Sequence, residues 1–220
     1  MEKIVILGSS GHAKVIIDIV EKQARYAILG FVDDFRAPGA ETLGYQVLGC
    51  ESDLPTLVAQ HSIKGIVIAI GDNAVREDVA TRVAGLCPGL MFINAIHPSA
   101  IIGRDVSIGV GTVIMAGGIV NPSCEIGNFC IVNTKASLDH DSTMQDFSSL
   151  APGVSTGGGC RVGRLAAVGI GASLRHGISI GECAVVGGQS MVLEDVPPYT
   201  VAYGSPAKTI RSRGRGEKYL

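Results

Sequence analysis

Aliphatic residues recur at every sixth position through the second half of the chain. From Ile102 to Val192, fifteen of the sixteen positions in this register are aliphatic, and the remaining one is Thr156. A second register, four residues later, holds small or β-branched residues from Val106 to Ser190. An α-helix needs a period near 3.6, and a sandwich does not keep a six-residue phase over some ninety residues. The pattern therefore predicts a β-helix of hexapeptide repeats.

The geometry of such a coil follows from the repeat. Residues two apart in a strand face the same side, so the small residue and the next aliphatic residue both point inward. The two residues after them form a corner, where glycine is frequent. Three hexapeptides make one triangular turn, so residues eighteen apart stack about 4.8 Å from each other.

The first 95 residues lack the repeat and alternate between strand and helix patterns. They predict a small parallel, Rossmann-like α/β sheet. We expect strands at 4–7, 28–32, 65–70 and 91–93, and helices at 11–22, 53–60 and 73–84. The predicted division is a Rossmann-like α/β domain at 1–95 and a β-helix domain, with the C-terminal tail, at 96–220.

Charge and cysteine usage exclude several classes. The chain has 18 basic and 20 acidic residues, a net charge of −2, which does not favour nucleic acid as a partner. The apolar start, Met1–Leu7, is too short for a signal peptide or a membrane span, so we expect a cytoplasmic protein without a membrane partner. No CxxC pair occurs, and three of the six cysteines fall on the small inward register. Buried free thiols are predicted, rather than disulfides or a metal site.

One corner of the predicted coil carries a candidate general base. His140 is followed by Asp141 and preceded by Asp139, and a neighbouring carboxylate orients an imidazole and raises its proton affinity. Gly158 lies eighteen residues further on, so it stacks above His140. Its missing side chain leaves room for a thioester, and its N–H is a candidate oxyanion donor. A solvated surface corner is the alternative interpretation of this histidine.

Polar and glycine residues follow three strands of the predicted sheet, where open α/β sheets bind ligands. A turn suited to binding phosphate precedes the first helix, and a simple strand-to-helix turn is the alternative interpretation. The aspartates after the second strand are candidates for ribose or base contacts, or for helix caps, and Asp72 and Asn73 are also candidate N-caps. The substrate-binding candidates are Gly8, Ser9, Ser10, Gly11, His12, Asp33, Asp34, Gly71, Asp72 and Asn73.

Taken together, these motifs resemble a known family. They are the hexapeptide repeat, Gly8-Ser9-Ser10-Gly11-His12, Gly71-Asp72-Asn73 with Arg76, Asn133-Thr134 before Asp139-His140-Asp141, and Gly204-Ser205-Pro206-Ala207-Lys208. The sequence resembles bacterial sugar O-acyltransferases of the sialic acid O-acetyltransferase type. Within them it is most similar to the N-acetyltransferases of nucleotide-linked 4-amino-4,6-dideoxy sugars, in the GDP-perosamine and UDP-bacillosamine pathways. The match runs from about residue 3 to residue 210.

The resemblance implies a left-handed β-helix and a homotrimer with active sites between neighbouring coils. It implies acetyl-CoA as co-substrate, no metal, His140 as base, Asp141 as its partner and the Gly158 amide facing the acetyl carbonyl. The sugar amine then attacks the thioester directly. Cofactor contacts are expected from Gly158, Ser149, Gly169, Ala207 and Lys208. In several relatives a histidine stands nine residues after the base, and Ser149 replaces it here, which puts that acetyl contact in doubt.

Other functions remain open at this point. A β-helical carbonic anhydrase needs three histidines around zinc, but His140 and His176 are two coil turns, roughly 9 to 10 Å, apart. A trimeric nucleotide-sugar-binding scaffold would bind without turnover. A sugar O-acetyltransferase would use the same base on a hydroxyl group. The sequence identifies neither the nucleotide, whether GDP, UDP or dTDP, nor the stereochemistry of the sugar.

Overall fold

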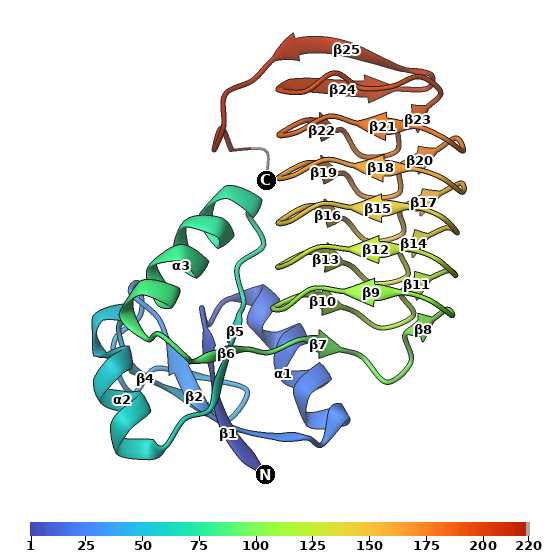
Figure 1. Ribbon diagram of the computed structural model, residues 1–220. Coiled ribbons are helices and arrows are strands. Elements are labelled where there is room, and N and C mark those ends of the chain that lie inside the picture. Colours follow the sequence, from blue (N-terminus) through green and yellow to red (C-terminus); the bar gives the residue numbers. More distant parts are fainter. Residues whose placement is uncertain (219–220) are drawn as a thin grey trace. The chain divides into compact units, whose positions relative to one another are not determined.

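The computed structural model describes residues 1–218 and divides into two compact units. The first comprises Met1–Gly71 and Val75–Pro98, and the second comprises Asp72–Ala74 and the chain from Ser99 onward. The N-terminal unit, in blue to green in Figure 1, alternates helices and strands, whereas the second unit is a stack of short strands. The predicted fold class, a Rossmann-like α/β unit followed by a parallel β-helix, is confirmed.

The N-terminal unit is built on one sheet with the strand order β3-β4-β2-β1-β5-β6. Its central strand β1 is fully buried over Ile4–Ile6, which is why this segment is continuously apolar. All seven predicted strands and helices form, and their ends lie within two residues of the expected ones. The short strands β3, β4 and β7 and a 3-10 turn are additional. The elements are β1 (Glu2–Leu7), α1 (Gly11–Gln23), β2 (Tyr26–Val32), β3 (Glu41–Thr42), β4 (Tyr45–Gly49), a 3-10 turn (Glu51–Asp53), α2 (Leu54–His61), β5 (Gly65–Ile68), α3 (Asn73–Leu86), β6 (Met91–Phe92) and β7 (Ala95–Ile96).

The sequence predicts a wholly parallel sheet, but one pair of its strands is antiparallel. Strands β3 and β4 pair antiparallel through a turn at Leu43 and Gly44, both of which have positive φ angles. Such two-residue turns match the twist of the flanking strands. Leucine is rare in the left-handed region, and β3 is only two residues long, so the hairpin has only Gly44 as a sequence signal.

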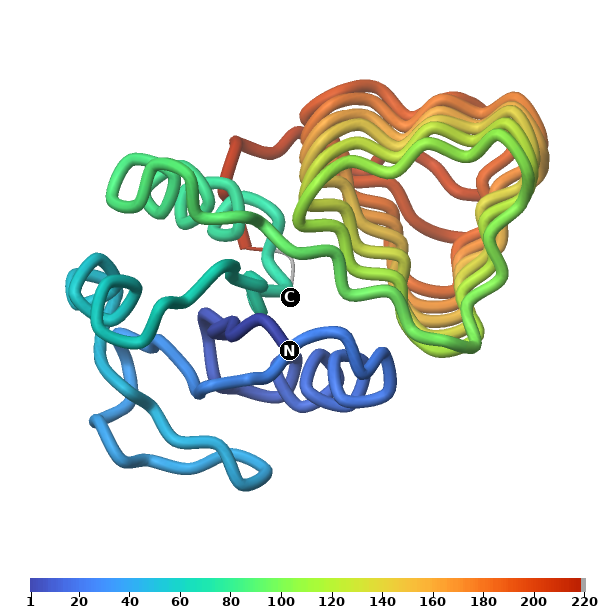
Figure 2. The backbone as a smooth tube through the Cα atoms, turned by 60° about the horizontal axis from the view of Figure 1, so that its bottom comes forward, coloured from blue at the N-terminus to red at the C-terminus, as the bar shows by residue number. Residues whose placement is uncertain are grey.

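The second unit winds through three sheets, in which the short coil strands pair in parallel, so that the chain passes from one side of the coil to the next. Figure 2 shows these sides nearly end-on. One sheet contains β8 (Ile101–Ile102), β11 (Ile119–Val120), β14 (Ser137–Leu138), β17 (Ser155–Thr156), β20 (Ser173–Leu174) and β23 (Met191–Val192). A second contains β9 (Ser107–Ile108), β12 (Glu125–Ile126), β15 (Thr143–Met144), β18 (Arg161–Val162) and β21 (Ser179–Ile180). The third contains β10 (Val113–Ile114), β13 (Ile131–Val132), β16 (Ser149–Leu150), β19 (Ala167–Val168), β22 (Val185–Val186), β24 (Thr200–Gly204) and β25 (Ala207–Ser212).

The register of the coil is eighteen residues, as the repeat predicts. Ile119 pairs with Ser137, for example, and Ser155 pairs with Ser173. The aliphatic register points inward and is nearly all buried, apart from its first members, since Ile102 is 38% exposed. The small register is buried too, and its three cysteines, Cys124, Cys130 and Cys160, are free thiols in the core. Their role is packing.

The last turns of the coil end in an antiparallel hairpin. Strand β24 pairs in parallel with β22 and then in antiparallel fashion with β25. The hairpin covers the edge that the last coil strand would otherwise expose, and open edges are sites of unwanted pairing.

Within residues 1–218, no helix combines the length and the apolar character needed to span a membrane.

Candidate active site

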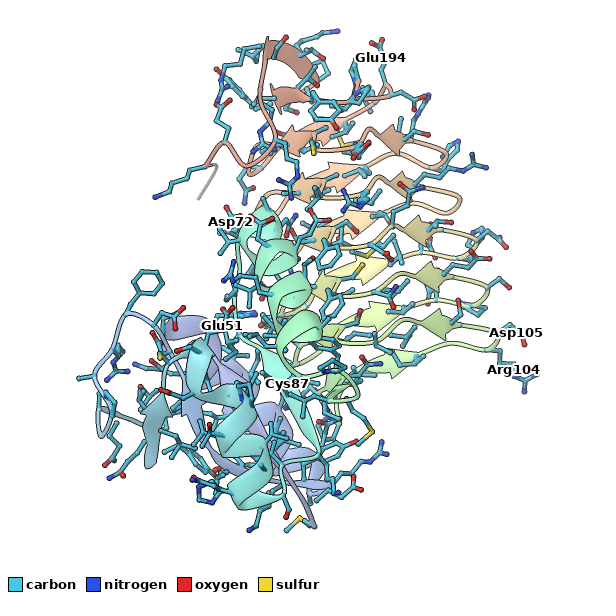
Figure 3. All side chains as sticks on the ribbon, turned by 60° about the vertical axis from the view of Figure 1, so that its left-hand side comes forward. Glu51, Asp72, Cys87, Arg104, Asp105 and Glu194 are labelled. Carbon is cyan, nitrogen blue, oxygen red and sulfur yellow. The ribbon has the colours of Figure 1, made fainter. Side chains whose placement is uncertain are left out.

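His140 lies at the corner that follows β14, where the backbone turns between two sides of the coil. Its column runs from Arg104 in the first turn to Glu194 in the last, and Figure 3 labels both ends. The next residue, Asp141, is in the left-handed region with a φ of 57°, and its N–H donates to the carbonyl of Pro122 one turn earlier at 3.1 Å. The corner geometry therefore points the two side chains outward together.

His140 and Asp141 form a close side-chain pair. His140 Nδ1 lies 2.7 Å from Asp141 Oδ2. An ionised carboxylate only accepts hydrogen bonds, so Nδ1 carries the proton and Nε2 presents its lone pair. The hydrogen bond with Asp141 and, next, the negative charge of Asp139 raise the pKa of His140 above its usual value. The predicted base and its partner are thus brought together.

Asp139 has a separate role at this corner. Its Oδ1 accepts hydrogen bonds from Asn121 Nδ2 at 2.6 Å and from the His140 backbone N–H at 2.9 Å. These two bonds, in that order, lower the pKa of the Asp139 carboxyl, which keeps it charged. Asn121 was not predicted as a site residue. The signal was available, because Asn121 precedes Asp139 by one coil turn.

Gly158 lies directly beside the imidazole of His140. A Cβ built on Gly158 would stand 2.5 Å from both Cε1 and Nε2 of that ring. The absent side chain thus makes room for the base itself, which differs from the room for a thioester expected from the sequence. The backbone N–H of Gly158 makes no hydrogen bond to an acceptor within residues 1–218.

The glycines on either side of Gly158 have different causes. A Cβ on Gly157 would lie 2.6 Å from the backbone nitrogen of His176, so this corner is closed to any side chain. Gly159 has a φ of 69° and open space around it, and its N–H donates to the carbonyl of His140 at 2.8 Å. The triple glycine therefore combines a tight corner, a place for the imidazole and a left-handed position.

A cavity of about 400 Å³ lies at the carboxyl ends of the strands in the N-terminal unit. It contains Gly8, Ser9 and Ser10 of the predicted phosphate turn, together with Asp33, Asp34 and Gly71. The predictions missed further lining residues, chiefly Phe35, Arg36, Glu51 and Arg82, of which Glu51 is labelled in Figure 3. Phe35 and Arg36 directly follow the aspartate pair, so their position in the chain was the available signal.

Hydrogen bonds fix the rim of this cavity. Asp33 Oδ2 accepts from the N–H and the hydroxyl of Ser9 at 2.8 and 2.5 Å. Asp34 Oδ1 accepts from the Glu51 N–H at 2.7 Å, and the Glu51 carboxylate binds Arg82 Nε at 2.6 Å. Ser10 is the N-cap of α1 but makes no side-chain cap hydrogen bond. Helix N-termini attract anions through such orphan N–H groups, so this end of the cavity is a candidate site for a phosphate.

Four predicted substrate residues are not among those that line this cavity. Gly11 and His12 start α1, and the buried Nε2 of His12 has no hydrogen-bond partner among the described residues. Burial and then the charge of Arg76 lower the pKa of His12 to about 4, so it is neutral at pH 7. Asp72 Oδ1 accepts from the Ala74 N–H at 3.0 Å, in the manner of a cap.

The side chain of Asn73 forms hydrogen bonds with the backbone of the coil. Its Nδ2 donates to the carbonyls of Leu165 and Ala166, at 3.3 and 3.0 Å. The short segment Asp72–Ala74 accordingly belongs to the second unit. Asn73 is buried, so its amide is part of the packing at this place in the structure.

The other predicted cofactor residues lie on the third sheet of the coil and its corners. Ser149 is in β16, and its strand neighbour one turn later is Ala167 in β19. Gly169 follows β19, and a Cβ there would lie 2.6 Å from the Gly188 nitrogen. Ala207 and Lys208 begin β25, opposite Gly204 and Tyr203.

Among residues 1–218, no three His, Cys, Asp or Glu side chains lie close enough together to form a candidate metal site.

The β-helix of hexapeptide repeats and the His140–Asp141 corner are consistent with an acyltransferase. The family described as the PglD N-terminal domain matches residues 3–83. PerB from Caulobacter crescentus, solved in complex with CoA and GDP-perosamine, is 34% identical with a TM-score of 0.89, over 96% of this chain and 98% of that one. The same enzyme has been solved with one histidine replaced by asparagine or by alanine.

Two further similar proteins are also acetyltransferases. GDP-perosamine N-acetyltransferase of Escherichia coli O157:H7 is 27% identical over 79% of this chain and 78% of its own length. The acetyltransferase domain of PglB from Neisseria gonorrhoeae, in complex with acetyl coenzyme A, is 29% identical with a TM-score of 0.87, over 95% of this chain and 99% of that one. The chain belongs to the nucleotide amino sugar acetyltransferase family, and it is an acetyl-CoA-dependent acyltransferase.

Proposed function

We propose that this enzyme transfers the acetyl group of acetyl-CoA to the 4-amino group of a nucleotide-linked 4-amino-4,6-dideoxy sugar, with His140 as general base. The observation that carries this proposal is the His140–Asp141 pair beside Gly158. Nδ1 of His140 is bonded to Asp141, which leaves Nε2 to accept a proton, and the backbone N–H of the adjacent Gly158 is the candidate oxyanion donor. A base and an oxyanion donor at one place are the two groups that acyl transfer requires.

The reaction proceeds in a single addition and collapse. The amine nitrogen attacks the thioester carbonyl while its proton passes to His140 Nε2, and the Gly158 N–H stabilises the resulting oxyanion. The carbon–sulfur bond then breaks, and CoA leaves as a thiolate. Asp141 stabilises the imidazolium through its hydrogen bond to Nδ1, as a carboxylate partner does in other base-assisted acyl transfers. No covalent enzyme intermediate is involved.

The N-terminal domain, residues 1–95, is proposed to hold the nucleotide. The diphosphate lies at the N-terminus of α1, beside Gly8–Ser10, because the orphan N–H groups and the helix dipole favour an anion there. The ribose then reaches Asp33 and Asp34 at the adjacent strand end. His12 is neutral, so any contact that it makes with a phosphate is a hydrogen bond without a charge.

The β-helix domain, residues 96–220, is proposed to act as a homotrimer with acetyl-CoA between coils, near Ser149, Gly169, Ala207 and Lys208. His140 and Asp141 are 61% and 68% exposed in a single chain. A second coil beside them would exclude water and strengthen the electrostatics of the reaction. Light scattering is expected to give the mass of three chains. We place the reaction in the cytoplasm and its product in polysaccharide biosynthesis.

The test is thiol release from acetyl-CoA with purified protein and GDP-, UDP- and dTDP-linked 4-amino-4,6-dideoxy sugars. Each amino sugar is paired with the analogue that carries a 4-hydroxyl group. We expect rapid release with one amino sugar and slow or no release with its hydroxyl partner. Turnover of the hydroxyl sugar alone would replace the proposal with O-acetylation. Binding without release across the panel would leave a nucleotide-sugar-binding scaffold.

Asp141→Asn is expected to change the pH dependence of the enzyme. The base must be neutral to accept a proton, so kcat/KM falls as pH drops through the raised pKa of His140. Asparagine removes the largest cause of that rise, and the acid limb of the profile should move to lower pH. The plateau should also fall by about 10-fold, part of the ~10²–10⁴ that a positioned base supplies.

The control for this variant is Asp139→Asn, which removes a smaller contribution to the same pKa and should shift the limb less. The profiles are measured with saturating acetyl-CoA and limiting amino sugar. An acid limb that does not move in Asp141→Asn would show that the titrating group is not His140.

A further inference from the structure

Phe35 presents a bare aromatic ring at the edge of the N-terminal cavity. Its side chain is 98% exposed, the largest exposure among the large apolar residues of the described chain. The residue lines the cavity of about 400 Å³ that holds Gly8–Ser10, and it also lines a second cavity of about 360 Å³ with Asp33, Asp34 and Asp53. Phe35 therefore borders both cavities at the same strand ends.

The backbone that carries this ring is held in place on both sides. The Phe35 N–H donates to Asp33 Oδ1 at 2.8 Å. The guanidinium of Arg36 donates to Thr42 Oγ1 at 2.6 Å, to the Glu41 carbonyl at 3.0 Å and to the Ser9 carbonyl at 3.2 Å. The loop is thus tied to the phosphate turn and to β3. A fixed loop that holds an apolar ring in water is preorganised for a flat partner.

The neighbours of the ring indicate which partner it meets. Asp33 binds both Ser9 of the phosphate turn and the backbone of Phe35, so one carboxylate connects the candidate phosphate site to the aromatic residue. In a nucleoside diphosphate, the base lies on the far side of the ribose from the phosphates. Val75 of α3 is 48% exposed and supplies a second apolar surface to the cavity.

We propose that the Phe35 ring stacks on the nucleobase of the sugar nucleotide. The inference rests on the proposed function, since it needs the diphosphate at the N-terminus of α1. Stacking tolerates every base because each has a π-face, and a purine covers more of the ring than a pyrimidine does. Phe35 is therefore a binding residue that favours a purine nucleotide over a pyrimidine nucleotide.

The direct test uses Phe35→Trp. The chain contains no tryptophan, so this variant carries a single indole at the proposed stacking position. GDP and UDP are expected to quench its fluorescence with saturation, at concentrations that match their calorimetric Kd, while inorganic pyrophosphate leaves it unchanged. An indole that does not respond to a nucleotide which calorimetry shows to bind would overturn the proposal.

The loss variants are Phe35→Ala and Phe35→Leu, with Leu43→Ala as the control. Leu43 is also an exposed apolar side chain of the same unit, at 59%, but it does not line the cavity. We expect Phe35→Ala to raise the Kd of GDP about 10-fold or more, and that of UDP less. Phe35→Leu should fall between it and the wild type. The control should bind like the wild type.

The outcomes separate this proposal from the proposed function. Wild-type protein that binds nucleotides and releases thiol, with unchanged Kd and KM in Phe35→Ala, defeats only the stacking role. A change in trimer mass with unchanged nucleotide affinity would assign the ring to a contact between copies, and it would also overturn the proposal. Wild-type protein that binds no nucleotide would defeat both.

Discussion

His140→Ala is expected to lower kcat by about 10² to 10⁴, the usual contribution of a positioned general base. The side chain is 61% exposed and packs into no core, so its removal leaves the coil intact. The KM for acetyl-CoA should change little, since the base acts on the amine. Thiol release under saturating substrates measures the loss, and light scattering verifies that the assembly is unchanged.

The matched control for this variant is His176→Ala. His176 occupies the same corner column two turns later, and no carboxylate within residues 1–218 is bonded to its ring. It should retain wild-type turnover. A His140→Ala enzyme within threefold of the wild type would refute the assignment of the base. Equal losses of turnover in both variants would instead indicate that activity depends on the side chains of this corner column in general, and not on a base at His140.

Gly158→Ala is expected to reduce turnover almost as strongly, through steric displacement of the base. The new Cβ would stand 2.5 Å from Cε1 and Nε2 of His140, far inside van der Waals contact. The imidazole must rotate away, which breaks its hydrogen bond with Asp141. The backbone can accept alanine, because its φ is not in the left-handed region and side chains occupy the same corner in other turns. We expect a fall in kcat of about 10²-fold.

Gly159→Ala is the control for this second prediction. A Cβ at Gly159 meets nothing within 4 Å, and Asp141 takes the same left-handed corner one turn earlier. Its turnover should stay close to that of the wild type, with a small loss in thermal stability. If Gly158→Ala acts through the ring, adding it to His140→Ala should cause no further loss of kcat. A fully additive double variant would contradict displacement of the base.

The coil is the part of the fold that the sequence specifies most completely. Its aliphatic register admits only one inward-facing arrangement, because slipping by one residue would turn every buried side chain outward. The eighteen-residue turn also predicts that Gly158 stacks on His140, and the structure shows the two side by side. The same arithmetic also predicts Asn121 next to Asp139, a contact that the structure shows at 2.6 Å.

The N-terminal cavity was only partly predictable. Strand ends placed Ser9 and Asp33 at one edge of the sheet, since parallel strands end together. They did not show that Glu51 and Arg82 line the same cavity, because their pairing joins segments 31 residues apart. The chain likewise gave no sign that the Asn73 amide would be used by the coil rather than by a ligand.

The sequence by itself determined the two-part architecture, the register of the coil, the burial of three free cysteines inside it and the corner that holds His140, Asp141 and Gly158. Short-period patterns fix these features, because a strict repeat converts chain position into spatial position. The tertiary structure decided which atom of His140 is available, why Gly158 lacks a side chain and which residues surround the cavity. Those features depend on side-chain directions and on contacts between distant segments, which no local period encodes.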